Sequence, residues 1–144
     1  MFKKILYPTD FSDVSKKALS YIAQLKDAGV EEVIVLHVID EKGIEAVSRY
    51  GAGSSATVIG LIDKEARDEG MKIEKKLRKS GFKVKVRIEI GVPLREILKV
   101  EEEEKVSVIV IGSHGKTNLG QMLLGSVSEK VIRLSKSPVL VVKR

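Results

Sequence analysis

The sequence predicts a single α/β domain built on a doubly wound, five-stranded parallel sheet with helices on both faces. Five short apolar runs alternate along the chain with segments in which apolar residues recur at helical spacing. Strands that alternate with helices form parallel sheets joined by right-handed crossovers. The chain has 144 residues, a length typical of one domain, so we place the domain at 1–144.

The N-terminal part of the chain predicts a strand, a helix and a second strand. The first strand is expected at Ile5–Pro8. From Ser12 onward, apolar residues recur at helical spacing up to Leu25, and Gly29 suits the position just past a helix end. The segment Glu32–Ile39 contains the apolar run VIVLHVI, which is typical of a strand covered on both faces.

The middle of the chain is less regular. Residues 40–56 show no clear period, and two interpretations stay open, a mobile connection and a frayed helix. Helical spacing returns at Ile59 and stops at Gly81. Apolar and charged residues then alternate over Phe82–Ile90, which predicts a half-exposed edge strand.

The C-terminal third supplies two more strand–helix units. Pro93 suits the first position of a helix, and Val106–Ile111 reads as a buried strand. Apolar positions from Val127 to Leu134 indicate a last helix, and Val139–Val142 predicts the fifth strand. In such sheets ligands bind at the carboxyl ends of strands, where the strand order switches.

Composition excludes several classes of protein. The chain has no cysteine, which rules out disulfides, thiolate zinc sites and cysteine catalysis. No apolar run approaches the roughly 20 residues of a membrane span, and the start lacks a signal-peptide core, so we expect a cytoplasmic protein without membrane contact. The net charge is +6, but acids are interleaved with the lysines and aromatics are 4%, so we expect no nucleic-acid partner.

A glycine-rich segment follows the fourth predicted strand. Gly112 can permit a sharp turn, and Gly115 can adopt positive φ, so that successive amides form an anion nest. Ser126 and Glu129 have the spacing of a capping box, and a helix start attracts anions. The alternative stays open that the glycines merely shape loops and Ser126 merely caps a helix.

The same segment has the pattern G-x2-G-x9-G-[ST], from Gly112 to Ser126, which resembles the signature of ATP-binding universal stress proteins. The resemblance extends to ILYPTDFS, VIVLHVID, GSHGKTN and SPVLVVKR, in that order along the chain. It implies strand order 3-2-1-4-5, a homodimer, and ATP at the strand ends. The connection Asp40–Thr57 looks shorter than in some ATP-binding relatives, which leaves the covering of the nucleotide open.

The resemblance also assigns residues to the nucleotide. It implies that the first strand's end borders ATP, that the Val38 backbone bonds adenine, that 112–118 wrap the ribose and phosphates, and that 125–128 hold the phosphate tail. The residues are Pro8, Thr9, Asp10, Val38, Gly112, Ser113, His114, Gly115, Lys116, Thr117, Asn118, Gly125, Ser126, Val127 and Ser128.

Some polar residues have two interpretations. Asp10 either coordinates a divalent cation, Mg²⁺ or Mn²⁺, or contacts ribose, or simply starts the first helix with Ser12. Lys116 is either a phosphate partner or a solvated lysine. His37 is expected to be a satisfied core residue, and His114 either approaches a phosphate or is exposed. No nucleophile with its base can be named.

The function expected is therefore that of a nucleotide-dependent switch or sensor in stress response, with ATP, ADP or AMP bound and an unidentified protein partner. A slow ATPase and a nucleotide-free dimeric interaction module are the alternatives. The apolar strand Val139–Val142 is last in the sheet, and pairing with its own copy would cover its edge in a homodimer.

Overall fold

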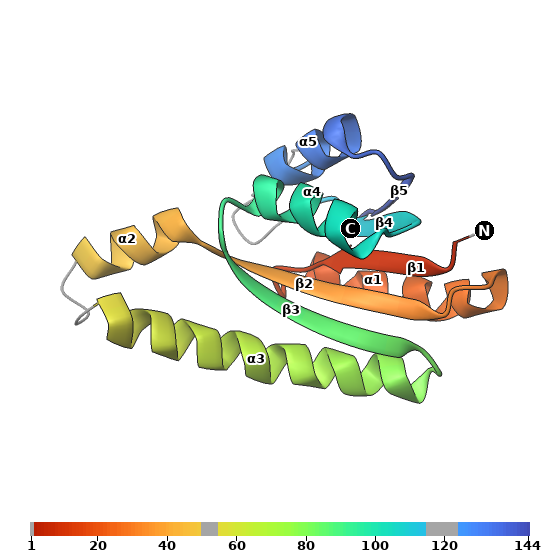
Figure 1. Ribbon diagram of the computed structural model, residues 1–144, viewed down its shortest axis with the longest axis horizontal. Coiled ribbons are helices and arrows are strands. Elements are labelled where there is room, and N and C mark those ends of the chain that lie inside the picture. The colour runs from red at the N-terminus through yellow and green to blue at the C-terminus, as the bar shows by residue number, and fades with distance from the viewer. Residues whose placement is uncertain (1, 50–54, 115–123) are drawn as a thin grey trace.

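The computed structural model describes residues 2–49, 55–114 and 124–144. Its sheet has the predicted order β3-β2-β1-β4-β5, and every pair of neighbouring strands is parallel (Figure 1). The strands are β1 (Lys4–Pro8), β2 (Glu32–Asp40), β3 (Lys83–Gly91), β4 (Val108–Gly112) and β5 (Val139–Val142).

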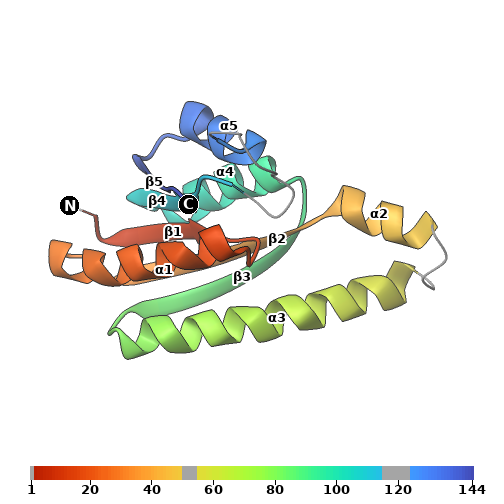
Figure 2. The same cartoon turned by 180° about the vertical axis from the view of Figure 1, so that it is seen from behind.

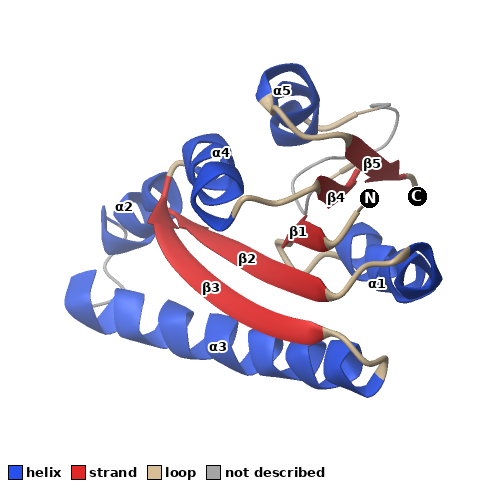
Figure 3. Cartoon of the chain, turned by 45° about the vertical axis from the view of Figure 1, so that its right-hand side comes forward, coloured by secondary structure: helices blue, strands red, loops and turns tan. Residues whose placement is uncertain are grey.

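Helices cover both faces of this sheet, as the alternating pattern predicts (Figures 2 and 3). Two of them, α1 and α3, pack on one face, and α4 and α5 pack on the other. The helices are α1 (Asp13–Leu25), the 3₁₀ turn η1 (Lys26–Ala28), α2 (Glu41–Arg49), α3 (Ser55–Lys79), α4 (Pro93–Glu104) and α5 (Ser126–Leu134).

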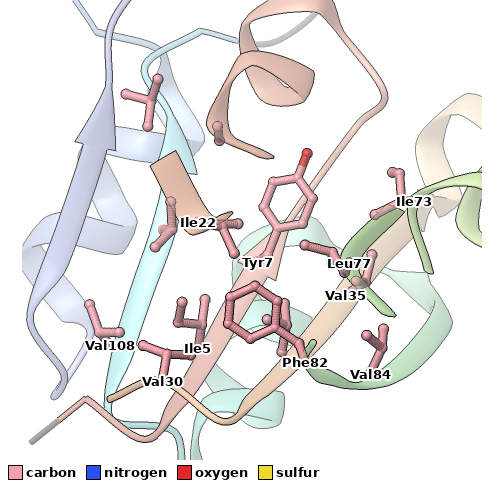
Figure 4. Close-up of a cluster of buried hydrophobic side chains, with 14 residues drawn as sticks. Ile5, Tyr7, Ile22, Val30, Val35, Ile73, Leu77, Phe82, Val84 and Val108 are labelled. Atoms are coloured by element: carbon pink, nitrogen blue, oxygen red, sulfur yellow. The ribbon is translucent and has the colours of Figure 1, made fainter. Parts of the chain in front are cut away.

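The central strands separate two apolar cores. Side chains alternate along a strand, so Val35 of β2 faces α1 and α3, whereas Leu36 faces α4 and α5. Figure 4 shows the first core, in which Tyr7 of β1 lies among aliphatic side chains from the strands and helices. Both faces of β1 and β2 are therefore dry, which explains their nearly continuous apolar runs.

The segment 40–56 is not a mobile connection over its first part, because Glu41–Arg49 forms helix α2. This helix contacts α3, and each helix contributes a buried apolar side chain, Ile44 and Val58. The next helix, α3, starts at Ser55, before the first apolar residue that marked it in the sequence, Ile59. Helix α2 has nine residues, fewer than the roughly 11–18 over which a helical period is read from a sequence.

The edge strand β3 is tied to α4 by ion pairs around Glu104. Lys85 Nζ lies 2.7 Å and Arg87 Nη1 lies 3.1 Å from Glu104 Oε1, and the Glu104 side chain is 12% exposed. The hydrogen bond from Lys85 is the main cause that lowers the pKa of Glu104, and Arg87 acts in the same direction against the effect of burial.

We expect Glu104→Gln to lower the free energy of unfolding by about 1–2 kcal/mol at pH 7. Because the folded-state pKa of Glu104 is lowered, the stabilisation is complete above the unfolded value of 4.5 and is lost as pH falls through the lower folded value. Urea unfolding of both proteins from pH 7 to pH 3 should therefore show the difference shrinking with acid. Glu102→Gln, at an exposed position of the same helix, is the control. A difference that grows with acid would contradict this origin.

None of the helices in the described part of the chain has both the length and the apolar character needed to cross a lipid bilayer.

Candidate functional site

A tight turn follows β1 and is held by the side chain of Thr9. Its Oγ1 accepts hydrogen bonds from Phe11 N (3.0 Å) and Ser15 Oγ (2.6 Å). Its main-chain N donates to Leu36 O of β2 (2.8 Å). Thr9 is 6% exposed, so these bonds form largely away from water. The turn is thereby fixed to both β2 and the first turn of α1.

Phe11 in this turn has φ of 64°, in the left-handed region that a bulky residue rarely adopts. Such a conformation costs on the order of 1–3 kcal/mol and persists where surrounding contacts determine it. Its ring stacks on His37, with centroids 4.3 Å apart and 23° between the ring planes. The stacking and the hydrogen bond to Thr9 are contacts that hold Phe11 in place.

Below the turn lies a buried polar network. The Tyr7 hydroxyl donates to Ser15 O (2.7 Å) and lies 3.3 Å from Ser15 Oγ. Burial raises the pKa of Tyr7, and hydrogen bonding to Ser15 and Thr9 opposes that rise only in part, so the phenol is neutral. A tyrosine inside an apolar strand needs a hydrogen-bond partner, and this is the signal by which the sequence could have revealed the network.

Asp10 and Ser12 start helix α1. Ser12 is the N-cap, and its Oγ accepts from Ser15 N (3.2 Å), while Asp10 Oδ1 accepts from Ser12 N (2.9 Å). These hydrogen bonds are those expected if Asp10 and Ser12 start the first helix, one of the interpretations of Asp10 given above. The described residues contain no cluster of three His, Cys, Asp or Glu side chains that could hold a metal ion.

The end of β4 lies against the start of α1. A Cβ added to Gly112 would be 3.2 Å from Ser15 N, 3.3 Å from Ser15 Cα and 3.3 Å from a methyl of Val14. Strand β4 is also the neighbour of β1 in the sheet, where Ile109 pairs with Leu6. The end of β4 and the start of the helix that follows β1 therefore lie side by side.

Hydrogen bonds close the base of the glycine-rich loop. Gly125 N donates to Ser113 O (2.6 Å), and Ser113 N donates to Val142 O of β5 (2.8 Å). Ser128 Oγ donates to Gly112 O (2.8 Å). The chain therefore leaves β4 and returns to α5 at the same place.

Two of the predicted phosphate-side hydroxyls are buried in this base. Ser113 has no exposed surface, and its Oγ lies 2.7 Å from His114 Nδ1. Ser128 is 5% exposed, and its Oγ donates the hydrogen bond to Gly112 O described above. His114 is half-buried. The predicted residues Gly115, Lys116, Thr117 and Asn118 lie outside the described residues.

The predicted capping box at Ser126 is wrong. Gly125 is the N-cap in an extended conformation, no side chain of the described residues caps the helix, and Ser126 is its first residue. Glu129 N instead donates to Gly125 O (2.9 Å), and the Glu129 carboxylate lies 4.0 Å from Arg133. The letter spacing is that of a capping box, but the buried glycine takes the cap position one residue earlier.

This correction leaves the start of α5 better suited to an anion. The first amides of a helix have no partner within it, and no side chain among the described residues caps this helix. Ser126 is exposed, Val127 is half-buried, and both belong to this first turn. The amides and the helix dipole together favour a bound phosphate.

His37 is not the core residue that the sequence suggested. It is half-buried near the carboxyl end of β2, and its Nδ1 lies 2.8 Å from Thr9 O. With Phe11 it lines a cavity of about 260 Å³ on the side of α1 and α3. Other lining residues are Lys16, Ile62, Glu65, Ala66 and Glu69. No residue of β4 lines this cavity.

The remaining predicted residues lie along the same edge. Pro8 is buried as the last residue of β1 and pairs with Leu36. Val38 lies two residues further along β2, and its side chain packs in the core on the side of α4 and α5. Its main chain, rather than its side chain, is therefore what can meet a ligand.

Comparison with known proteins gives a consistent result. The sequence pattern of the Universal stress protein family matches residues 1–143. Universal stress protein MJ0577 of Methanocaldococcus jannaschii is 46% identical over 156 residues, covering 100% of this chain and 96% of the relative. A solved structure of the hypothetical protein MJ0577 has a TM-score of 0.90 at 49% identity, covering 100% of this chain and 97% of that chain.

A second solved structure is more distant. The universal stress protein from Archaeoglobus fulgidus in complex with dAMP is 22% identical, with a TM-score of 0.65, and the match covers 99% of this chain and 98% of that chain. At this identity the likeness concerns the fold alone.

Proposed function

This chain belongs to the universal stress protein family, and from that premise we propose that it binds ATP and acts as a nucleotide-dependent switch in stress response. The observation that carries the proposal is the contact of Gly112 with Ser15. The turn after β1, the end of β4 and, through the hydrogen bond of Ser128 to Gly112, the start of α5 thus lie close together, and we propose that ATP binds in a crevice between them. Three chain segments can then donate main-chain N–H groups to one ligand.

In this proposal the base and the phosphates occupy different parts of the crevice. The Val38 main chain bonds adenine at the end of β2. The segment 112–118 surrounds the ribose and phosphates, and the first turn of α5, with the exposed Ser126, holds the phosphate tail. Amides and helix dipoles bind phosphate without any basic side chain.

A divalent cation would bind between Asp10 and the phosphates. Mg²⁺ commonly takes one or two carboxylates together with phosphate oxygens and water, so a single aspartate beside the crevice fits this mode. If Asp10 binds the cation together with the phosphates, ATP affinity should fall when Mg²⁺ is removed from the wild type. In Asp10→Asn the affinity should depend much less on Mg²⁺.

The proposal is tested first on the purified protein. Mass spectrometry of the small molecules released on denaturation should detect an adenine nucleotide, and calorimetry should show ATP binding to the nucleotide-free protein with Mg²⁺. GTP is the control ligand. Absence of a co-purified nucleotide together with no heat at millimolar ATP would refute the proposal. Hydrogen exchange with ATP and with ADP then tests the switch, which requires two different protection patterns.

We also propose that β5 pairs with its own copy in a homodimer. The strand lies at one edge of the sheet, and Leu140 is 39% exposed there. Unpaired edge strands invite such pairing, and a two-fold axis closes it.

Leu140→Lys should weaken this dimer about tenfold or more, because each lysine would lie within the interface. Light scattering after gel filtration over a range of protein concentrations measures the change. Leu61→Lys, at a position 66% exposed on α3, is the control and should leave the dimer intact. A wild-type protein that is monomeric at all concentrations would refute the interface.

A further inference from the structure

The main-chain ladder between β1 and β2 stops at Thr9. Thr9 N donates to Leu36 O (2.8 Å), which continues the pairing of Pro8 with Leu36. In a parallel ladder the next hydrogen bond would run from Val38 N to Thr9 O, because groups that face the same neighbour are two residues apart. Among the described residues, no main-chain hydrogen bond joins Val38 to Thr9.

The His37 ring occupies the acceptor that this bond would use. Its Nδ1 lies 2.8 Å from Thr9 O, and since a carbonyl can only accept, Nδ1 carries the proton. The ring is held in place by its stacking on Phe11. Phe11 in turn has the left-handed backbone that bends the chain away from the path of β1. One side chain therefore ends the ladder at the point where the chain turns.

We infer that His37 is a positioning residue for the nucleotide base: by holding the Thr9 carbonyl, it leaves the Val38 main chain facing the crevice. This inference rests on the proposed function. Val38 then offers an N–H donor and a C=O acceptor side by side. Adenine complements this pair, because one of its ring nitrogens accepts a hydrogen bond and the adjacent amino group donates one. The edge of guanine has the opposite order of donor and acceptor, so it is not matched.

The inference predicts a loss of affinity without a loss of stability. In His37→Leu the Thr9 carbonyl becomes available, and Val38 N–H can add the missing rung to the ladder. ATP affinity should fall about tenfold, the worth of one hydrogen bond, while the urea midpoint of the nucleotide-free protein does not decrease. His37→Asn is the matched variant, because its amide nitrogen is the same number of bonds from Cα as Nδ1. It should bind ATP within about threefold of the wild type.

Hydrogen exchange of the Val38 amide gives a readout that needs no nucleotide. In the nucleotide-free wild type this amide should exchange rapidly, and in His37→Leu it should be protected like the amides of the ladder. ATP should slow the exchange in the wild type.

The two proposals fail in different ways. A wild type that does not bind ATP refutes the proposed function, while the Val38 exchange still tests how the ladder ends. A Val38 amide already protected in the nucleotide-free wild type refutes the inference about His37. So does a folded His37→Leu variant that binds ATP as the wild type does, or a His37→Leu variant whose loss of affinity is matched by His37→Asn.

Discussion

Replacing Gly112 with valine should reduce ATP affinity by about 100-fold, the equivalent of losing about two hydrogen bonds to the charged phosphates. The hydrogen of Gly112 faces Ser15, whose main-chain N and Cα would lie 3.2 and 3.3 Å from an added Cβ. These are backbone atoms of a capped helix start, so they cannot rotate away. The γ-methyls of valine would enlarge the overlap and push the end of β4 away from α1, which opens the crevice.

The series Gly112→Ala and Gly112→Val separates this effect from general damage. Alanine requires its neighbours to shift by a few tenths of an ångström and should cost less affinity than valine. Overpacking should also lower the free energy of unfolding by about 1–3 kcal/mol, which urea titration measures. Calorimetry at a temperature where all variants are folded then measures affinity.

Gly60→Ala is the control for adding a methyl group to a glycine elsewhere. A Cβ at Gly60, within helix α3, would meet no atom within 4 Å, so the change should raise stability by up to about 1 kcal/mol and leave affinity unchanged. A Gly112→Val protein that is folded and binds ATP like the wild type would show that the two strand ends do not form the site.

The second large effect is expected at Glu101, a carboxylate of α4 that is 7% exposed. Its Oε1 accepts hydrogen bonds from Lys136 N (2.8 Å) and Ser137 N (2.7 Å), the last amides before Pro138 and β5. Glu101→Leu fills the same space but removes the acceptor from both. Each bond is made to a charged group, so we expect a loss of about 2–4 kcal/mol in the free energy of unfolding.

Glu101→Gln keeps a carbonyl oxygen at this position and should cost only about 1 kcal/mol. Urea unfolding at one fixed protein concentration compares the three proteins, since stability depends on concentration if the chain dimerises. Equal losses in Glu101→Leu and Glu101→Gln would show that the charge, rather than the two hydrogen bonds, matters here.

Most of the fold was predictable because the sheet is covered on both faces. The continuous apolar runs are short and rich in β-branched residues, which is typical of buried strands. The charged alternation over Phe82–Ile90 marks an edge strand, which β3 is. For residues 40–56 the sequence left two interpretations open, a mobile connection and a frayed helix, and Glu41–Arg49 forms helix α2. Its nine residues are fewer than the roughly 11–18 over which a helical period is read from a sequence. Its formation depends on contact with α3, which no local pattern records.

The site was predictable where it depends on strand ends and glycines, and not where it depends on contacts between distant residues. Thr9 and His37 are 28 residues apart in the sequence, and the register of β1 against β2 brings them close together. Neither apolar period nor residue spacing contains that register. The left-handed backbone of Phe11 was equally hidden, because a bulky residue is the last choice for such a position.

Helix α3 is longer than the strand it packs beside. Its 25 residues span about 38 Å at 1.5 Å per residue, whereas the nine residues of β3 span about 30 Å. Its first turns, together with α2, project past the carboxyl ends of the strands as a pair of helices (Figure 1). Lengthening or shortening this projecting pair would change the length of the chain without shifting the register of any strand. We therefore expect insertions or deletions there to leave the strand ends in place.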